Sequence, residues 1–399
     1  MKVGVYISNI DPESGGCYTF ENGILNALGG VSSRHQFTVF HYGRLPGPLA
    51  PGVSSVRLDE QASLPFRCAR KIRKILARAT GGQPESGLLQ NAVARYDVDL
   101  MWFTTQAFEP VGVPYIYTVL DLQHRLQPYF PEVSTKGWTW EEREMVLANA
   151  ISRASFVITP NAVGQKEVAE FYRVPKDRIK ILPHPTSDFA LHPPVDANPS
   201  LVLPQTYIFY PAQFWPHKNH IAILQALRIL KDEHKFKCHV VFVGSDKGNR
   251  EYIQNQVHEL GLSGQVGFYD FVATADLVRM YREAQALVYV SFFGPENLPP
   301  LEAFALGCPV IAAKVDGAEE QLGDAAVMVD PRNGQDIARA IANLYEDLGL
   351  RKRLIERGKV RASKWIVKDY INGIINIIDE FEPIRRCWDS SINVRNMPT

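Results

Sequence analysis

The sequence predicts an α/β protein of two domains, each built on a parallel sheet. The chain has 399 residues, which exceeds the about 100 to 200 of an ordinary single domain. Short apolar runs alternate with helix-like stretches, the pattern of strands joined by crossover helices. Prolines and small polar residues at 191–205 interrupt this pattern. We therefore expect a first domain at 1–195 and a second at 196–375.

The composition is that of a globular protein with a reduced interior. Hydrophobic residues make up 46% and charged residues 22%, with 43 basic against 43 acidic side chains. This balance argues against a surface for nucleic acid or other polyanions. The five cysteines are scattered and lack a Cys-x-x-Cys pair, which favours the cytoplasm over disulfides or zinc. No apolar run approaches the about 20 residues of a membrane span, so any membrane contact should be peripheral.

The first element is a buried-type strand at residues 2–10, KVGVYISNI, which starts too early for a secretory signal to precede it. The loop after it contains Gly15 and Gly16, which let the backbone approach a ligand closely. A plain turn is the alternative reading. A second strand runs through Leu120 and delivers Asp121 and His124 into a loop, where His124 either touches a substrate or is a loop histidine without a ligand.

Two other segments of the first half carry decoy patterns. Asp97 and Asp99 match a metal-binding Asp-x-Asp, but they lead straight into an apolar strand and are predicted to cap its edge. Residues 67–78, from Arg67 to Arg78, hold six basic residues and no acid on an amphipathic pattern. Such a helix either lies on an anionic membrane or is simply solvated. Lys166 and Glu167 are read as a solvated helix face.

In the second half, the apolar runs and the stretches between them define five strands and five helices. Ligands of open parallel sheets bind beyond the carboxyl ends of the strands. The loops that hold Lys218, Gly244, Asn297 and Glu302 follow such ends and should converge on one site. The predicted strands are 207–210, 240–243, 286–290, 309–312 and 326–329, and the helices are 220–234, 249–260, 274–284, 301–306 and 334–347. A last helix is expected from Lys364 to Phe381, before Pro383.

Residues 291–310, SFFGPENLPPLEAFALGCPV, are the most informative segment, because they form a strand end, a polar turn and a helix. Pro299 and Pro300 suit a first helical turn, so a helix is predicted from about Leu301 to Gly307 with Glu302 in its first turn. Free N–H groups of a helix start attract phosphate, and a carboxylate there suits ribose hydroxyls. An ordinary βα unit is the alternative.

The LPPLEAFALGCPVI run resembles the donor-binding signature of the group 1 (family 4) retaining glycosyltransferases, the glycogen-synthase-like enzymes of GT-B fold. The resemblance implies two Rossmann-like domains facing each other across a cleft, with residues 376–399 packing back on the first. It implies that Glu302, the second Glu of a Glu-x7-Glu pattern, binds the donor ribose. Gly294 stands where the first Glu would be, which leaves Glu296, Asn297 and Leu298 as substitute donor contacts.

Further donor contacts are implied by the same resemblance. The segment 207–219, YIFYPAQFWPHKN, is similar to the family's strand and Lys-Asn loop, so Lys218 is the candidate for the donor diphosphate. A fixed ammonium stabilises charge that grows on the leaving group; a solvated lysine is the alternative. Gln213 stands where many members have Arg or Asn. Gly244 lies in the next loop, and Tyr269 and Phe271 lie in a segment at 266–277 that resembles the family's nucleobase loop.

On the acceptor side, the family has a Gly-rich loop at Gly15 and Gly16 and commonly carries His-Asp where this chain has Leu120 and Asp121. His124, oriented by Asp121, is the predicted substitute for that histidine.

The sequence therefore predicts a retaining hexosyltransferase that uses a nucleoside diphosphate sugar and a glycan or lipid-linked oligosaccharide acceptor, as in polysaccharide or lipopolysaccharide O-antigen biosynthesis. The GP-x-N-x-PP-x-EAF-x-LG pattern resembles a mannosyl- or rhamnosyltransferase branch. No metal or other cofactor is expected. Two alternatives stay open: a nucleotide-sugar epimerase of the same fold, and a non-catalytic glycan- or nucleotide-binding partner, which the departures at Gly294, Leu120 and Gln213 favour.

Overall fold

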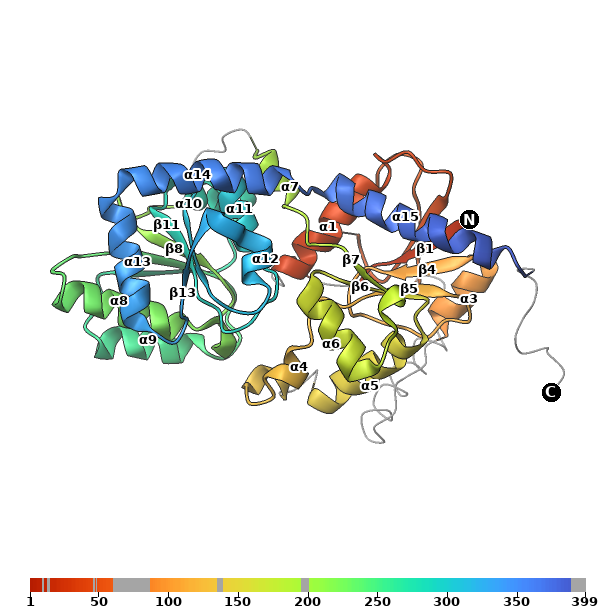
Figure 1. The fold of residues 1–399 in the computed structure, drawn as a ribbon, viewed down its shortest axis with the longest axis horizontal. Helices are drawn as coiled ribbons and strands as arrows, with labels where there is room; N and C mark the ends of the chain where they lie inside the picture. The colour runs from red at the N-terminus through yellow and green to blue at the C-terminus, as the bar shows by residue number, and fades with distance from the viewer. Residues whose placement is uncertain are drawn as a thin grey trace.

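A computed structural model describes residues 1–8, 11–12, 15–45, 47, 49–59, 87–134, 139–194 and 201–388. Residues 67–78 and the tail beyond 388 lie outside these ranges. Figure 1 shows two lobes, each with a central sheet between helices. The N-terminal sheet has the order β3-β2-β1-β4-β5-β6-β7, and the C-terminal sheet has the order β10-β9-β8-β11-β12-β13. All of the strand pairs are parallel.

The N-terminal lobe follows the βα pattern from its first residues. Its central strands are almost fully buried, because helices cover both faces of the sheet, whereas the two edge strands at 54–57 and 179–181 are partly exposed. In β1, only Lys2 is exposed. The strands are β1 Lys2–Tyr6, β2 Gln36–His41, β3 Ser54–Arg57, β4 Leu100–Phe103, β5 Tyr115–Thr118, β6 Phe156–Thr159 and β7 Ile179–Ile181. The helices are α1 Gly16–Leu28, α3 Leu88–Arg95, α4 Gln123–Leu126, α5 Trp140–Arg153 and α6 Ala162–Tyr172, with 3-10 turns η2 Pro131–Val133 and η3 Lys176–Arg178.

The C-terminal lobe contains every predicted strand and one further strand that the sequence pattern did not predict. Residues 266–269 form edge strand β10, although they were read as part of a loop. All four are only half-buried, so the strand lacks the apolar run that marks the others. The strands are β8 Ile208–Pro211, β9 Val240–Val243, β10 Val266–Tyr269, β11 Ala286–Tyr289, β12 Val310–Ala313 and β13 Ala326–Val329. The helices are α7 Asp188–Leu191, α8 His220–Asp232, α9 Arg250–Glu259, α10 Thr274–Glu283, α11 Leu298–Leu306, α12 Ala318–Leu322, α13 Gly334–Glu346 and α14 Leu348–Ser363, with η4 Pro216–Lys218 and η5 Gly323–Ala325.

The chain crosses between the lobes twice. Leu182 belongs to the N-terminal core and Ala190 of α7 to the C-terminal core, so the first crossing lies between them. Ala362 is the last residue of the C-terminal core, and Val367 returns to the N-terminal core. Both crossings lie upstream of the boundaries at 195 and 376 that composition suggested, because α7 and the start of α15 pack before the sequence pattern changes.

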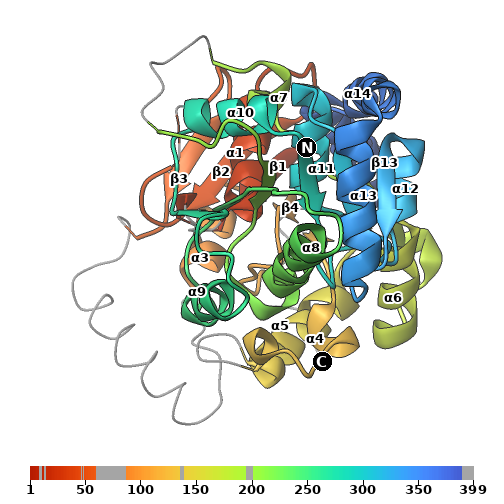
Figure 2. The same cartoon turned by 90° about the vertical axis from the view of Figure 1, so that its left-hand side faces the viewer.

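The last helix, α15 Val367–Arg385, packs on α1 of the first lobe. Figures 1 and 2 show it continuing from α14, which covers the other lobe. Pro383 lies inside this helix rather than after it; it stands in the last turn, where the loss of one N–H is tolerated better than at the centre. The expected return of the C-terminal helix is thus confirmed.

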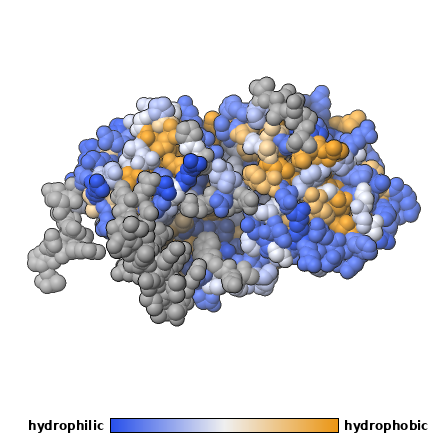
Figure 3. Space-filling view, turned by 180° about the vertical axis from the view of Figure 1, so that it is seen from behind, coloured by the Kyte–Doolittle hydropathy of each residue, from blue (hydrophilic) through white to orange (hydrophobic). Residues whose placement is uncertain are grey.

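Within the described residues, no helix is both long and apolar enough to cross a membrane. The surface in Figure 3 is mainly hydrophilic, with apolar patches on both lobes.

Candidate active site

The carboxyl ends of the two sheets meet in the region between the lobes. The Gln127 side chain donates to Phe292 O at 3.0 Å, and the Asn161 side chain donates to Pro295 O at 3.0 Å. The His184 amide donates to Glu296 Oε2 at 2.6 Å. Each bond joins a loop of the first lobe to the loop after β11. The loop after β11 therefore contacts three separate segments of the first lobe.

Lys218 lies at the carboxyl edge of the second sheet and is half-buried. It ends the 3-10 turn η4, and its Nζ donates to the Tyr289 hydroxyl at 3.2 Å. The next residue, Asn219, has a φ of 58°, a left-handed backbone that Gly and Asn adopt most readily. Its side chain donates to Val290 O and Pro331 O. A Lys-Asn sequence thus fixes both the turn and the direction of the lysine.

Tyr289 links Lys218 with the start of α11. Its hydroxyl accepts from the lysine ammonium, and the same residue lines a pocket together with Asn297 and Pro300. The helix begins at Leu298, three residues before the expected Leu301, so the placement of Glu302 in the first turn was wrong. Pro299 stands inside the helix, and only Leu298 among the first three helical residues carries an N–H.

Leu298 itself is 7% exposed and packs in the hydrophobic core of the first lobe. Its Cδ1 lies 3.7 Å from where a Cβ on Gly16 would stand. The Gly15–Gly16 turn thus lies opposite the start of α11, across the lobes. Gly15 has φ 72° and ψ −126°, a conformation that favours glycine, and no atom of the described residues lies within 4 Å of a Cβ built there. The Leu298 side chain is packed in the core and is not free for a donor.

Gly294 and Asn297 form a tight turn before this helix. Gly294 has a φ of 133°, and a Cβ there would lie 2.5 Å from Asn297 Nδ2. The Asn297 amide donates to Gly294 O at 2.9 Å. Its Oδ1 has no partner among the described residues. The place of the family's first carboxylate is therefore filled by an amide, which keeps one acceptor for a ligand.

Glu296 is buried at 9% exposure and faces His184. Its Oε2 accepts from the His184 amide, and the His184 ring Nδ1 lies 3.5 Å away. Burial raises the pKa of Glu296 to about 8, with the Glu320 charge adding to the shift. Burial also lowers the pKa of His184 to about 4. This carboxyl group joins the lobes, and its only described oxygen contacts are with His184.

Glu302 lies inside the second lobe rather than on its surface. Its two oxygens accept from Ser187 Oγ at 2.8 Å and from the Tyr281 hydroxyl at 2.6 Å. Burial raises its pKa. Because both oxygens are engaged, a ribose hydroxyl would have to replace one of these hydrogen bonds.

Asp121 follows β5 and lies near several groups of both lobes. Its Oδ1 accepts from the Gln123 amide at 3.0 Å. Its charge acts on the pKa of Cys17 in α1 and of His217 in η4, and Lys218 acts on the same two groups. Cys17 of the first lobe and His217 of the second therefore both lie within reach of these two charges.

His124 does not lie in the region between the lobes that contains the β11 loop. Its ring is 1% exposed, and Nε2 pairs with Glu144 Oε2 at 3.1 Å. Trp140 packs beside it. Glu144 of α5, and not Asp121, bonds to this ring, whereas Asp121 holds the loop through the Gln123 amide. Burial lowers the pKa of His124.

Comparison with known proteins decides the family. The sequence profile of the family described as "Glycosyl transferases group 1" matches residues 197–361, which span the second lobe. Residues 197–361 thus match the group 1 glycosyltransferase family. The resemblance predicted from the motif is confirmed over this part of the chain.

Known relatives of this glycosyltransferase domain are distant. O-antigen chain mannosyltransferase B of Escherichia coli is 27% identical over 239 residues, 58% of this chain and 62% of the relative. O-antigen chain mannosyltransferase RfbU of Salmonella typhimurium is 25% identical over 203 residues, 50% of this chain and 54% of the relative. The chain thus matches little more than half the length of these relatives.

Solved structures cover the whole glycosyltransferase fold. Sucrose-phosphate synthase from Thermosynechococcus elongatus has a TM-score of 0.71 at 17% identity, covering 96% of this chain and 99% of that one. WaaG, a glycosyltransferase involved in lipopolysaccharide biosynthesis, has a TM-score of 0.68 at 14% identity, covering 94% and 99%. Anabaena HepE in complex with UDP and glucose has a TM-score of 0.68 at 17% identity, covering 95% and 100%. The GT-B fold is therefore confirmed.

The remaining predicted donor residues of the glycosyltransferase domain are mostly engaged in packing. Gln213 bonds to Ser245 and Trp215. A Cβ on Gly244 would lie 2.3 Å from Ala212 O, so glycine lets two loops touch. Tyr269 donates to Val202 O at 2.9 Å, and Phe271 is 60% exposed. Of these, Phe271 alone offers a largely open side chain.

Sequence reasoning missed three groups near the cleft of the glycosyltransferase. Glu132 pairs with His217 across the lobes. Asn161 caps α6 and holds the β11 loop. Glu167, read as part of a solvated face, is half-buried, and burial together with the Asp121 and Asp316 charges raises its pKa to about 7. The local sequence gives no signal for Glu132 or Glu167. Asn161 alone could have been found, because an asparagine directly before a helix is typical of an N-cap.

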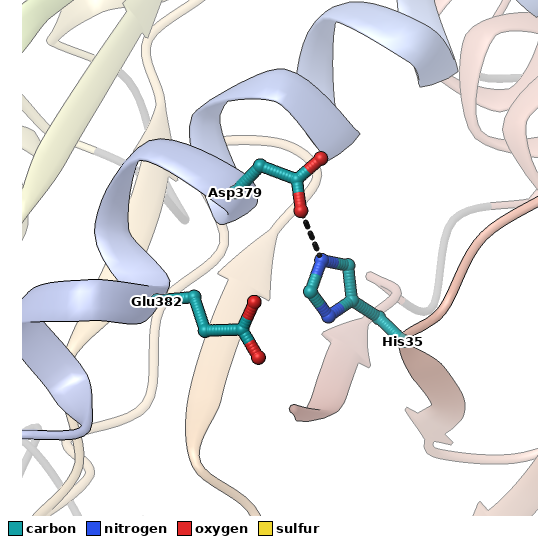
Figure 4. A group of neighbouring side chains, drawn as sticks. All are labelled: His35, Asp379 and Glu382. Atoms are coloured by element: carbon teal, nitrogen blue, oxygen red, sulfur yellow. Dashed lines mark hydrogen bonds and ion pairs between the residues drawn. The ribbon is translucent and has the colours of Figure 1, made fainter.

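The Asp-x-Asp pattern at Asp97 and Asp99 is structural, since both carboxylates pair with groups of the first lobe and of α15. Asp99 accepts from the Lys2 amide and pairs with Arg385, and Asp97 pairs with Lys2. In the described part of the chain, one group has metal-ligand geometry: His35, Asp379 and Glu382, shown in Figure 4. Arg34 pairs with both carboxylates, at 2.6 and 2.7 Å. This cluster lies at α15 and ties that helix to the first lobe.

Proposed function

We propose that this protein is a retaining hexosyltransferase that moves a mannose-like hexose from a nucleoside diphosphate sugar to a hydroxyl of a growing glycan. One observation carries the proposal: the Lys218 ammonium is bonded to Tyr289, which lines the same pocket as Asn297 at the start of α11. A cation and a helix start at the carboxyl edge of a parallel sheet are a site for a diphosphate. The names of the relatives, O-antigen mannosyltransferases, support the sugar and the glycan acceptor.

The proposed chemistry is a substitution at the anomeric carbon. The acceptor oxygen forms its bond to that carbon as the bond to the diphosphate oxygen breaks. The acceptor proton passes to the leaving phosphate, and Lys218 balances the charge that remains. Gly294 cannot supply a nucleophilic carboxylate, so the acceptor attacks from the face that the diphosphate leaves, which retains the configuration.

The other groups of the site hold the sugar and exclude water. The free Oδ1 of Asn297 is placed to accept from a sugar hydroxyl. The Gly15–Gly16 turn covers the donor from the first lobe. Closure of the lobes excludes water, since hydrolysis is the competing reaction. We propose that no metal is needed, because Lys218 carries the charge that a metal would otherwise offset.

The reaction is proposed to take place in the cytoplasm, where nucleotide sugars are available to a chain with unpaired cysteines. A lipid-linked acceptor would bring the protein to the inner face of the membrane, with residues 67–78 as the proposed peripheral contact.

Incubation with a panel of GDP- and UDP-sugars, with and without a glycan acceptor, tests this function. Release of nucleoside diphosphate that depends on acceptor, unchanged by EDTA, supports the transferase. Isomerised nucleotide sugar would mean an epimerase. Binding of GDP or UDP without turnover would mean a non-catalytic partner. The anomeric configuration of the product, read by NMR, tests retention.

A further inference from the structure

The segment 127–132 reaches from the first lobe to the two loops that surround Lys218, and we call it the clamp. Gln127 Nε2 donates to Phe292 O at 3.0 Å. The Phe130 ring stacks on Phe292, with centroids 6.0 Å apart and planes at 28°. Glu132 contacts His217, the neighbour of Lys218. Side chains at both ends and in the middle of the clamp thus contact the second lobe.

The base of the clamp is fixed to the first lobe. Arg143 of α5 donates to Glu132 O at 3.2 Å. Trp140 donates to His124 O at 2.8 Å, just before the clamp begins. Val133, just after it, is fully buried. The clamp is therefore built into the first lobe, and its side chains bridge to the second lobe.

The strongest of these contacts is a buried carboxylate on His217. Glu132 is 6% exposed, and its Oε1 accepts from the His217 amide at 3.1 Å and from the ring Nδ1. Among the described residues Oε2 is buried without a partner. Burial of a carboxylate is costly unless donors meet it. The contacts from the His217 amide and ring to Oε1 therefore offset part of the cost of burying Glu132.

That requirement extends to Lys218. Phe292 donates its amide to His217 O at 2.9 Å, so His217 is held on its N–H, its ring and its carbonyl. Lys218 is the next residue, and its own amide bonds to Trp215 O at 3.0 Å within η4. The Lys218 carbonyl accepts from the Tyr210 hydroxyl, so Lys218 is held within the second lobe on one side and is linked through His217 to Glu132 on the other.

We propose that Glu132 is a positioning residue of the transfer reaction: through His217 it sets Lys218 when the lobes close, so that leaving-group stabilisation is complete only in the closed, water-free state. This inference rests on the proposed function of Lys218. Glu132 touches neither donor nor acceptor, and it acts on the step in which the diphosphate leaves.

The test compares Glu132→Gln with Glu320→Gln in the full chain. Glu320 is a matched control, because its carboxylate also bonds across the lobes, to the Ala162 amide at 3.3 Å, but on α12. The donor is the nucleotide sugar that proves active in the panel. With it, we would measure kcat, the donor KM and the release of nucleoside diphosphate without acceptor. A displaced catalytic group costs rate more than ground-state binding, so E132Q should lower kcat about tenfold with the donor KM little changed. The share of donor lost to water should rise. E320Q should match the wild type in all three.

The positioning role is overturned if E132Q has the same kinetics as E320Q. It is also overturned if the activity of E132Q falls only because the donor KM is raised. If E132Q fails to fold, Gln127→Ala decides the proposal. A smaller fall in kcat and a smaller rise in hydrolysis in Gln127→Ala support the clamp. Wild-type kinetics in Gln127→Ala, together with an unfolded E132Q, overturn it. If the wild type releases nucleoside diphosphate from no donor, the proposed function falls as well, which distinguishes the two failures.

Discussion

The side-chain amide of Asn297 occupies the space that a side chain on Gly294 would need. Nδ2 lies 2.5 Å from the position of a Cβ there, and the φ of 133° at residue 294 disfavours any other residue. The departure from the family's Glu-x7-Glu pattern is therefore matched by a second change three residues later. The turn is built for glycine followed by asparagine, and it has not simply lost an acid.

Restoring the family's carboxylate should harm this protein. In Gly294→Glu, the left-handed backbone costs about 1–3 kcal/mol, and the new Cβ displaces the Asn297 amide. We expect a lower melting temperature and a fall in kcat/KM. Gly264→Ala serves as the control, because nothing lies within 4 Å of a Cβ there and its φ is not positive. Higher activity in Gly294→Glu would show that the site lacks a carboxylate after all.

Lys218→Ala should abolish turnover while the fold stays intact. Removal of one group that stabilises developing charge typically costs about 10²–10³ in kcat. The ammonium bonds only to the Tyr289 hydroxyl among the described side chains, so little stability is lost with it. Steady-state kinetics and the melting curve measure both effects. Lys231→Ala, on an exposed lysine of α8, should behave as wild type, and a Lys218→Ala enzyme with retained kcat would remove the diphosphate role.

Two substitutions at Glu302 separate the structural role of this carboxylate from its proposed role in donor binding. Glu302→Ala leaves the Ser187 and Tyr281 hydroxyls unpaired, so the free energy of unfolding should fall by about 1–3 kcal/mol, and the donor KM should rise. Glu302→Gln keeps the side-chain shape and should retain most of the stability. Urea unfolding and donor titrations distinguish the two variants. If Glu302→Gln has an unchanged donor KM, the carboxylate does not bind ribose.

Glu296 should make stability fall as the pH rises. Burial raises the pKa of its carboxyl to about 8 in the folded protein, against an ordinary value of 4.5. Between these pH values the folded state holds a proton that the unfolded chain releases, so this contribution is complete below about pH 4.5 and is lost as the pH rises through 8. The slope is at most about 1.4 kcal/mol per pH unit.

Comparison of wild type with Glu296→Gln in urea at pH 5 to 9 isolates this group. The wild type should lose stability relative to the variant across that range. The neighbouring His184 stays neutral there, because burial lowers its pKa to about 4. Parallel stability curves for the two proteins would mean that Glu296 is ionised in the fold.

Local patterns predicted the elements that bury a continuous apolar run. The predicted strand at 240–243 is β9, and the helix predicted from 220 is α8. Local patterns failed to predict an element where its apolar run was interrupted by proline or contained polar residues. Strand β10 lies half-exposed at a sheet edge, and α11 starts earlier because Pro299 and Pro300 occupy its first turn instead of preceding it.

The candidate site was predicted less completely than the fold. Lys218 and Asn297 were found because each follows a strand end, and strand ends of a parallel sheet share one edge. His124 was misplaced, because Glu144 and Trp140, which bury its ring, lie on a helix whose position the loop sequence does not encode.

The sequence by itself determined two α/β lobes, the glycine turns and the lysine at a strand end, since these depend on neighbours within a few residues. Only the tertiary structure decided which charges and hydroxyls pair. Ser187 and Glu302 are 115 residues apart, His184 and Glu296 are 112 apart, and Glu132 and His217 are 85 apart. The first pair forms because α7 packs on α11 within the second lobe, and the other two form because loops of the two lobes meet. No local backbone preference contains that geometry.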